Sequence, residues 1–228
     1  MKNLTIKMPK QAILAGKCNY ARGLMDKMSK KHAERRAEII KIARDLFLIQ
    51  DYDKTTMQDF MDSLGVAKGT IYHYFKSKED ILEAVIEDIV NEHFKKMQLL
   101  IATTSGNALE KIKTIFEEGK KISDPTILEK LHKRGNEAMH TRLLVATLIK
   151  QAPLYAKLIE QGFDEALFKT STPLEAAEFI LSALQFLTDM GIYPWAQKDL
   201  IRRFNAFPGL IEALLQAPKD SFQFIQLV

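Results

Sequence analysis

Cysteine is nearly missing from this sequence, and a single Cys18 among 228 residues excludes a disulfide bond within the chain. No apolar run approaches the roughly 20 residues that a membrane-spanning helix needs. Residues 1–28 have scattered lysines and one short apolar patch, 12–15, which is not the layout of a secretory signal peptide. These absences predict a protein of a reducing compartment, the cytoplasm by default, with no membrane partner.

Alternating apolar and polar residues, which are typical of β-strands, are also missing, as are internal repeats and low-complexity tracts. Apolar residues recur instead at the three- and four-residue spacing of helices, so the sequence predicts an all-α protein. Two prolines should shape it, with Pro153 interrupting one helix and Pro208 kinking another. We expect helices over about 31–50, 57–64, 68–75, 78–100, 107–121, 133–150, 154–168, 173–190 and 198–216, and a further helix start at Asp124-Pro125.

Two short helices around a glycine are predicted near residue 65. Four apolar residues of the first helix share one face, and Gly65 can then take the positive φ that reverses a chain after a helix. In the second helix Ile71 and Phe75 lie four residues apart and should face the core. Tyr72 and Tyr74 are about 200° apart on an ideal helix, so at least one of them must face outward.

Acidic residues are absent between Val66 and Lys78, where three lysines leave a positive local charge. The outward face of the second helix offers hydroxyls, an imidazole and aromatic rings, which can bond phosphates and base edges in a major groove. The bland interpretation is that the aromatic residues are simply core. The pattern nevertheless favours sequence-specific binding to DNA.

This segment resembles the N-terminal DNA-binding domain of the tetracycline repressor (TetR) family. The resemblance covers about fifty residues and rests on Thr55-Thr56, on Gly65-Val66, and on the run from Lys68 to Glu79. One departure is Met61, where the family commonly has alanine, and we expect it to push the two helices slightly apart. By position, the resemblance implies base or nearby backbone contacts from Gln58, Lys68, Gly69, Thr70, Tyr72 and His73, and phosphate contacts from Thr56, Tyr74 and Lys78.

The resemblance also implies an organisation and a mechanism. We expect an N-terminal arm at 1–30 that is basic and disordered, a three-helix DNA-binding domain at 31–78, and a helical ligand-binding and dimerisation domain at 79–228. The protein would be a regulator, expected to be a repressor, that binds a double-stranded, pseudo-palindromic operator as a homodimer. An unknown small-molecule effector would release it. The helix that begins at Lys78 would connect the domains, and its tilt would set the separation of the two recognition helices.

Charge supports only part of this scheme. Residues 1–78 contain 16 Lys and Arg against 8 Asp and Glu, but residues 32–78 alone contain 8 against 7. Most of the excess therefore lies in the N-terminal arm, which could add non-specific phosphate contacts. Alternatively, the arm contributes little, or translation begins at Met25 or Met28.

Two further sets of residues are candidates for the C-terminal functions. Aromatic and polar residues on the middle helices could line an effector cavity or simply be core: Phe94, Met97, Phe116, Met139, His140, Phe163, Gln185 and Phe186. Apolar faces of the last two helices could form a dimer interface or cover their own domain: Ala176, Ala177, Ile180, Leu184, Leu187, Leu210, Ile211, Leu214 and Leu215.

Catalytic groups are scarce. There is no glycine-rich phosphate loop, and Cys18 is more simply explained as an inert thiol. Two Glu-x-x-His steps, Glu129 to His132 and Glu137 to His140, have the spacing of di-iron bundle proteins but are only eight residues apart. We therefore predict no enzyme, metal or cofactor. The competing hypotheses are an all-α ligand- or protein-binding module without DNA binding and a metal-dependent bundle enzyme.

Overall fold

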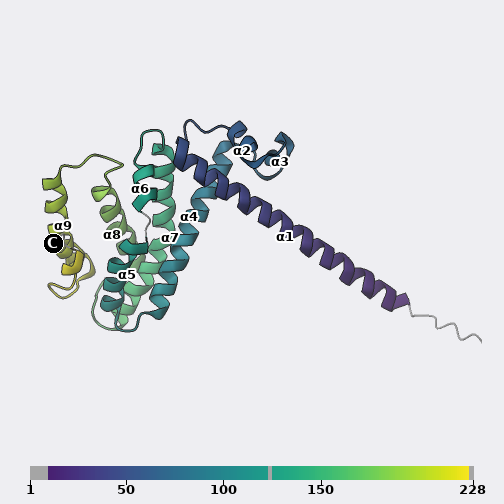
Figure 1. Cartoon of the computed structure of the whole chain (residues 1–228). Helices are drawn as coiled ribbons and strands as arrows, with labels where there is room; N and C mark the ends of the chain where they lie inside the picture. Colours follow the sequence, from purple (N-terminus) through teal and green to yellow (C-terminus); the bar gives the residue numbers. More distant parts are fainter. Residues whose placement is uncertain (1–9, 123–124, 226–228) are drawn as a thin grey trace, which may run out of the picture.

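The computed structural model describes the backbone of residues 10–122 and 125–225, and the side chains of residues 28–119 and 127–225. Within these ranges the secondary structure is helical and contains no strand, which confirms the all-α prediction. Three N-terminal helices pack at one end of a larger body made by the remaining helices (Figure 1). In the described helices, no segment is both long enough and apolar enough to cross a bilayer.

The N-terminal helices are α1 (Lys10–Gln50), α2 (Met57–Leu64) and α3 (Lys68–Tyr74). The bounds of α2 and α3 agree with the prediction, but the predicted start of α1 at residue 31 is wrong. No proline lies between residues 10 and 50, and the glycines there weaken a helix without stopping it. Helix α1 thus begins within the arm expected at 1–30 and projects away from the body (Figure 1), while residues 1–9 lie outside the described part.

The body consists of α4 (Lys78–Thr103), α5 (Ala108–Ile122), α6 (Pro125–Leu131), α7 (Glu137–Asp164), α8 (Pro173–Thr188) and α9 (Gln197–Leu215), followed by a 3₁₀ turn (Gln223–Ile225). The predicted interruption at Pro153 is wrong, because α7 continues through it. A helix-interior proline costs about 3 kcal/mol. Helix α7 packs against α4, α5 and α8 and buries Ala152 and Ala156, and this packing outweighs the local cost.

Capping residues fix several helix starts. The Asn107 side chain accepts a hydrogen bond from the backbone of Glu110 at 3.0 Å, and the Glu110 carboxylate accepts from the Asn107 backbone at 2.8 Å. The Ser77 hydroxyl also caps α4, because it accepts a hydrogen bond from Asp80 N–H at 3.1 Å, but the Asp80 carboxylate accepts from the Lys76 backbone at 2.9 Å instead of from Ser77. Thr172 precedes Pro173, the first residue of α8, but makes no side-chain cap, because its ψ of 68° is not the extended geometry of a capping residue.

Two clusters of buried residues form the core of the described chain. The first joins α1, α2 and α3 to the first half of α4, and it also includes Leu131 and Met139 from the body. The second lies among α4, α5, α7, α8, α9 and the C-terminal turn. The first half of α4 is therefore packed with the N-terminal helices, so its orientation and theirs are mechanically linked.

Candidate DNA-binding surface and effector cavity

A capping box and a left-handed glycine position α2 relative to α3. The Thr56 backbone N–H and hydroxyl both donate to the Asp59 carboxylate, at 2.7 and 2.8 Å, and Asp59 N–H returns a bond to the Thr56 hydroxyl at 3.3 Å. Helix α2 ends at Gly65, whose φ of 61° lets the chain turn. Met61, the departure from the family pattern, is buried in the core of this unit.

The outward face of α3 is exposed and carries the predicted polar groups. Ile71 and Phe75 are 0% and 3% exposed and anchor the helix. Lys68, Gly69 and His73 are exposed, and Thr70 is half-buried. Tyr72 is 41% exposed, and the Lys68 ammonium lies 5.4 Å from its ring centroid. Helix α3 thus presents a cation, a phenol and an imidazole beside a bare stretch of backbone.

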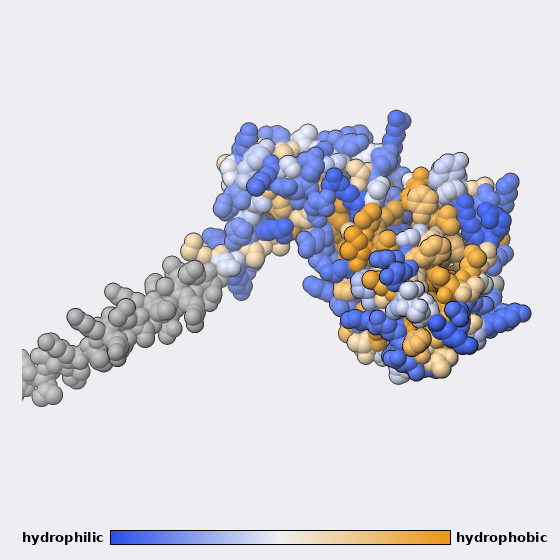
Figure 2. All heavy atoms as spheres, turned by 180° about the vertical axis from the view of Figure 1, so that it is seen from behind, coloured by the Kyte–Doolittle hydropathy of each residue, from blue (hydrophilic) through white to orange (hydrophobic). Residues whose placement is uncertain are grey.

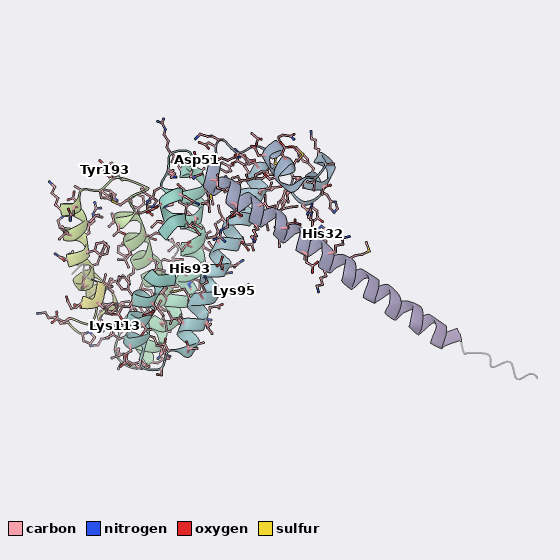
Figure 3. The ribbon with its side chains drawn as sticks, viewed as in Figure 1. His32, Asp51, His93, Lys95, Lys113 and Tyr193 are labelled. Atoms are coloured by element: carbon pink, nitrogen blue, oxygen red, sulfur yellow. The ribbon has the colours of Figure 1, made fainter. Side chains whose placement is uncertain are left out.

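The second tyrosine of α3 faces the protein, which confirms that the two rings diverge. Tyr74 is half-buried and packs against His32 of α1, with ring centroids 4.5 Å apart. His32 also meets the His73 ring edge-on at 5.5 Å, on the side of α1 that faces α3 (Figure 3). The Arg36 guanidinium lies 5.2 Å above the Phe75 ring. These contacts support α3 from behind.

Three of the residues expected at DNA have side-chain hydrogen bonds inside the chain. The Thr56 N–H and hydroxyl are engaged with Asp59, and the Gln58 amide donates to Asp62 at 2.7 Å. The Lys78 ammonium donates to the Tyr52 carbonyl at 3.0 Å and lies over the Tyr52 ring. Lys78 has further donors free for a phosphate, whereas Thr56 would have to release Asp59.

A junction that the sequence did not reveal connects the N-terminal helices to the body. The Tyr52 backbone N–H donates to the side chain of Asn136 at 2.6 Å, and Asp53 N–H donates to the Gly135 carbonyl at 3.1 Å. Asn136 is fully buried, and Asp51 stands at the junction (Figure 3). Sequence spacing gave no signal for it, because the bonded residues are more than eighty positions apart.

The body contains an apolar cavity of about 120 Å³. Tyr155 supplies the one polar side chain among its described lining residues, and burial raises the pKa of that phenol to about 12, so it stays neutral. A neighbouring, more polar hollow of about 280 Å³ shares Leu181 and Leu184 with the cavity and adds Thr147, Gln151 and Gln185. The main cavity is lined by Ile112, Phe116, Tyr155, Ile159, Ala177, Ile180, Leu181, Leu184, Ile211, Leu215, Phe222, Phe224 and Ile225.

The structure does not bring the predicted effector residues together. Phe116 lines the apolar cavity, and Gln185 lines the neighbouring hollow. Phe163 and Phe186 are exposed, and Met97 is buried in the second core. The remaining three lie elsewhere: Phe94 beneath the Lys150 ammonium, Met139 in the first core, and His140 beside Asp189. Helical spacing predicts which face of a helix a residue occupies, but it does not predict whether that face meets a cavity, the core or solvent.

The predicted dimer residues divide between two faces of the same helices. Ala176, Ala177, Ile211 and Leu215 are buried in the second core. Ile180, Leu184 and Leu187 are half-buried against it. Only Leu210 and Leu214 of the predicted set are exposed. The prediction left out the other exposed apolar residues of these helices, and the full exposed set on α8 and α9 is Leu174, Phe179, Phe186, Ile201, Leu210 and Leu214.

Hydrophobic side chains gather over the larger body in a view from behind, whereas the N-terminal unit is mainly hydrophilic there (Figure 2).

A helix-turn-helix unit with an exposed polar helix, joined to a helical body with an apolar cavity, defines a DNA-binding transcriptional regulator. Residues 39–85 match the family described as bacterial regulatory proteins, tetR family, and residues 121–210 match the tetracyclin repressor-like C-terminal domain. The chain belongs to the TetR family of transcriptional regulators, which are not enzymes.

Curated relatives support this assignment. An HTH-type transcriptional repressor, KstR2 of Mycolicibacterium smegmatis, is 36% identical over 84 residues, or 37% of this chain and 40% of that protein. The Rhodococcus jostii KstR2 is 26% identical over 63% of this chain and 72% of its own length. The uncharacterized regulator YfiR of Bacillus subtilis is 24% identical over 73% and 85%. The chain spans less than half the length of the first of these relatives.

Solved structures share the fold. A putative TetR-family regulator from Syntrophomonas wolfei superposes with a TM-score of 0.56 at 24% identity, covering 81% of this chain and 93% of that one. A TetR-family regulator from Pectobacterium atrosepticum gives 0.57 at 19% identity, with 83% and 98% covered. At these identities the similarity concerns the fold alone.

Proposed function

We propose that this protein is a repressor that binds a pseudo-palindromic DNA operator as a homodimer and leaves it when a small molecule occupies the C-terminal body. Residues 31–78 would bind the operator, and residues 79–228 would bind the effector and the second subunit. The observation that carries the proposal is the exposed polar face of α3, which is anchored from behind by Ile71 and Phe75. The M. smegmatis relative is named as a repressor, which favours that sign of regulation.

Recognition would combine base contacts with positioning contacts. Tyr72, His73 and Lys68 are exposed on one short helix and can reach base edges or phosphates in a major groove. Gly69 leaves the backbone between them uncovered, so a phosphate could approach it closely. Two such helices, placed about 34 Å apart by a two-fold axis, would read the two half-sites of an operator.

The second subunit would dock on the exposed apolar side of α8 and α9. Phe179 and Phe186 lie seven residues apart on α8, and Leu210 and Leu214 lie four apart on α9, so each pair forms a stripe on its helix. A stripe of this kind from each of two helices can pack against its own symmetry copy as a four-helix contact. The buried side of the same helices lines the cavity, so the effector site and the dimer interface would share two helices.

The effector would be an apolar molecule with a small polar end. The cavity is close in size to the roughly 150 Å³ apolar cavity that accepts a benzene-sized ligand. Together with the neighbouring hollow it reaches the roughly 300–1,000 Å³ typical of ligand pockets. Tyr155 in the first space, and Gln151 and Gln185 in the second, could bond the polar end.

Release would be a population shift between two positions of the DNA-binding unit. Helix α4 enters both cores, and the bonds from Tyr52 and Asp53 to the α6–α7 turn tie the unit to the body. An effector that binds better when these elements are displaced would move the dimer toward the form that cannot span both half-sites. The shift cannot exceed the difference between the effector's affinities for the two forms.

Operator binding is the first test. Fluorescence anisotropy at fixed salt would compare the intergenic DNA upstream of the gene with scrambled DNA of equal length, and DNA selected from a random pool would follow. We expect sequence-specific binding, and Tyr72→Ala should weaken it by about 1–3 kcal/mol through loss of base or positioning contacts. Tyr193→Ala is the matched control, because Tyr193 is also an exposed tyrosine but lies in the loop after α8, away from α3 (Figure 3).

If neither the upstream DNA nor any selected sequence binds the wild-type chain in preference to scrambled DNA, the protein is a helical binding module without operator recognition. A thermal-shift screen of fatty acids of increasing chain length would probe the cavity in the same samples. Ala177→Leu fills part of the apolar cavity and should abolish the shift, whereas exposed Val145→Leu should not.

A further inference from the structure

Two histidines and an aspartate from three separate parts of the body meet at the α6–α7 turn. His132 follows α6, His140 lies in the first turns of α7, and Asp189 follows the last residue of α8. The Nε2 atom of His140 is 3.0 Å from Asp189 Oδ2, and the Nε2 atom of His132 is 3.4 Å from Asp189 Oδ1. A donor atom from each of the three residues lies within 4.8 Å of the other two.

One nitrogen of this cluster lacks the partner that its burial requires. His132 Nε2 is shielded from solvent, yet it makes no hydrogen bond, because its approach to Asp189 lacks hydrogen-bond geometry. A buried polar atom without a partner costs about 1–3 kcal/mol. The His140 side chain is also almost entirely buried, at 4% exposure. The cluster therefore encloses possible metal-ligand atoms, and one of them, His132 Nε2, has no hydrogen-bond partner.

The loop after α8 packs closely against the two histidines and donates hydrogen bonds to Asp189. A Cβ on Gly191 would lie 2.3 Å from the His132 ring and 2.7 Å from the His140 ring, so only glycine allows this close approach. The backbone N–H groups of Gly191 and Ile192 donate to Asp189 Oδ1 at 2.7 and 3.1 Å. Such bonds from an outer shell hold a ligating carboxylate in orientation.

We propose that His132, His140 and Asp189 form a binding site for a divalent transition metal, Zn²⁺ or a close relative such as Co²⁺ or Ni²⁺. Two imidazole nitrogens with one carboxylate are a donor set that these borderline ions prefer over Mg²⁺ or Ca²⁺. Around a tetrahedral ion with bonds of about 2.0–2.1 Å, neighbouring donors stand about 3.3 Å apart. The two His–Asp separations, 3.0 and 3.4 Å, are close to that spacing but involve the two different oxygens of Asp189. An ion would therefore bind both carboxylate oxygens or draw the two rings toward one of them.

The ligand set differs from the one that sequence spacing offered. The Glu137 carboxylate accepts a bond from Gly135 N–H at 2.7 Å on the surface, and Glu129 is exposed. Neither Glu-x-x-His step places its glutamate at the cluster. The third ligand is Asp189, which lies 49 positions from His140 in the sequence. The proposed site therefore holds a single ion on two histidines and Asp189, in place of the di-iron ligands that the Glu-x-x-His spacing would supply.

An ion at this position would stabilise the packing of three elements. It would pin α6, α7 and the end of α8 to one another at the turn whose Gly135 and Asn136 hold the Tyr52 segment. An ion that binds only the folded chain raises its stability with concentration. Zn²⁺ should therefore raise the melting temperature of the whole protein, and the increase should depend on the three ligands.

The test uses the full chain without a polyhistidine tag, stripped of metal with a chelator. Calorimetric titration with Zn²⁺ should show a single ion per chain, and Co²⁺ should give the visible d–d absorption of a low-coordinate site. His132→Gln and Asp189→Asn should each weaken Zn²⁺ binding by more than about 100-fold, beyond the 10–100-fold effect of an outer-shell residue. Asp189→Asn keeps an oxygen for the Gly191 and Ile192 N–H groups, which favours an intact fold.

His32→Gln is the matched control, because it removes a histidine from the N-terminal unit and should leave Zn²⁺ affinity unchanged. Circular dichroism and the metal-free melting temperature would establish that each variant is folded. A wild-type chain that binds neither ion would overturn the proposal. So would Zn²⁺ affinities that are equal in the wild type and in both folded ligand variants.

Discussion

Gly69 is exposed on α3, and a methyl group placed on it would meet no atom of the chain within 4 Å. Its backbone is helical, so alanine would be accepted there at no steric cost. Within the free protein nothing requires a glycine at this position. We propose that the reason is a close approach of DNA, because Lys68 and Tyr72 on the same short helix can contact a phosphate backbone.

Gly69→Ala should therefore separate stability from DNA binding. Alanine in a helix is favoured over glycine, so the free energy of unfolding should rise by about 0.5–1 kcal/mol. Operator affinity should fall by about 1 kcal/mol or more, because the new methyl group occupies the space of the DNA. Urea denaturation and anisotropy measure the two quantities. Unchanged operator affinity in the stabilised variant would remove Gly69 from the interface.

Asp59 provides a pH-dependent contribution to α2. The Thr56 hydroxyl and then its backbone N–H donate to this carboxylate, and they lower the pKa of Asp59 below its ordinary 3.8. A lowered pKa means that the bonds stabilise the folded state above about pH 3.8 and that this stability is lost as the pH falls through the folded-state pKa. Asp59→Asn should cost less than about 1 kcal/mol at neutral pH, because the pair is exposed.

The difference between Asp59→Asn and wild type should shrink as the pH falls below 3.8, as measured by urea denaturation at several pH values. Asp53→Asn, on the link before α2, is the control. A difference that stays constant down to the acid transition would show that the charge of Asp59 does not contribute.

At the scale of the element, the turn between α2 and α3 depends on backbone conformation rather than on space. Gly65 has a φ of 61°, and no atom lies within 4 Å of its ideal Cβ position. Gly65→Ala should lower the free energy of unfolding by about 1–2 kcal/mol, because alanine must adopt the left-handed region. Urea denaturation measures this, with Gly69→Ala as the matched control of opposite sign. Equal effects of the two substitutions would contradict the backbone explanation.

Local sequence signals predict some helix boundaries correctly and others wrongly. Gly65 ends α2 and acts within one helical turn, so the sequence alone predicts its role. The predicted interruption at Pro153 is wrong because the local effect of the proline competes with packing of α7 against α4, α5 and α8. The predicted start of α1 is wrong because residues 10–30 contain no proline that would mark a helix boundary.

At the scale of the whole molecule, α8 and α9 present one apolar face to the core and another to the outside. Leu210→Glu should convert the proposed dimer to a monomer and weaken operator binding, because a charge would be buried in the interface. Sedimentation velocity measures the change. Ile201→Glu is the control, because Ile201 is also exposed on α9 but lies nine residues away, about 180° around the helix. Dimers that persist in Leu210→Glu would place the interface elsewhere.

The sequence by itself determined the helical fold, the helix-turn-helix unit and the outward groups of α3, because these follow from spacing, caps and turns within a few residues. Tertiary structure decided which face of α8 and α9 is buried, which residues line the cavity, and that Asn136 bonds to Tyr52. It also brought His132 and His140 to Asp189. Periodicity orients a side chain only about its own helix axis, and the neighbour it meets depends on how separate helices pack.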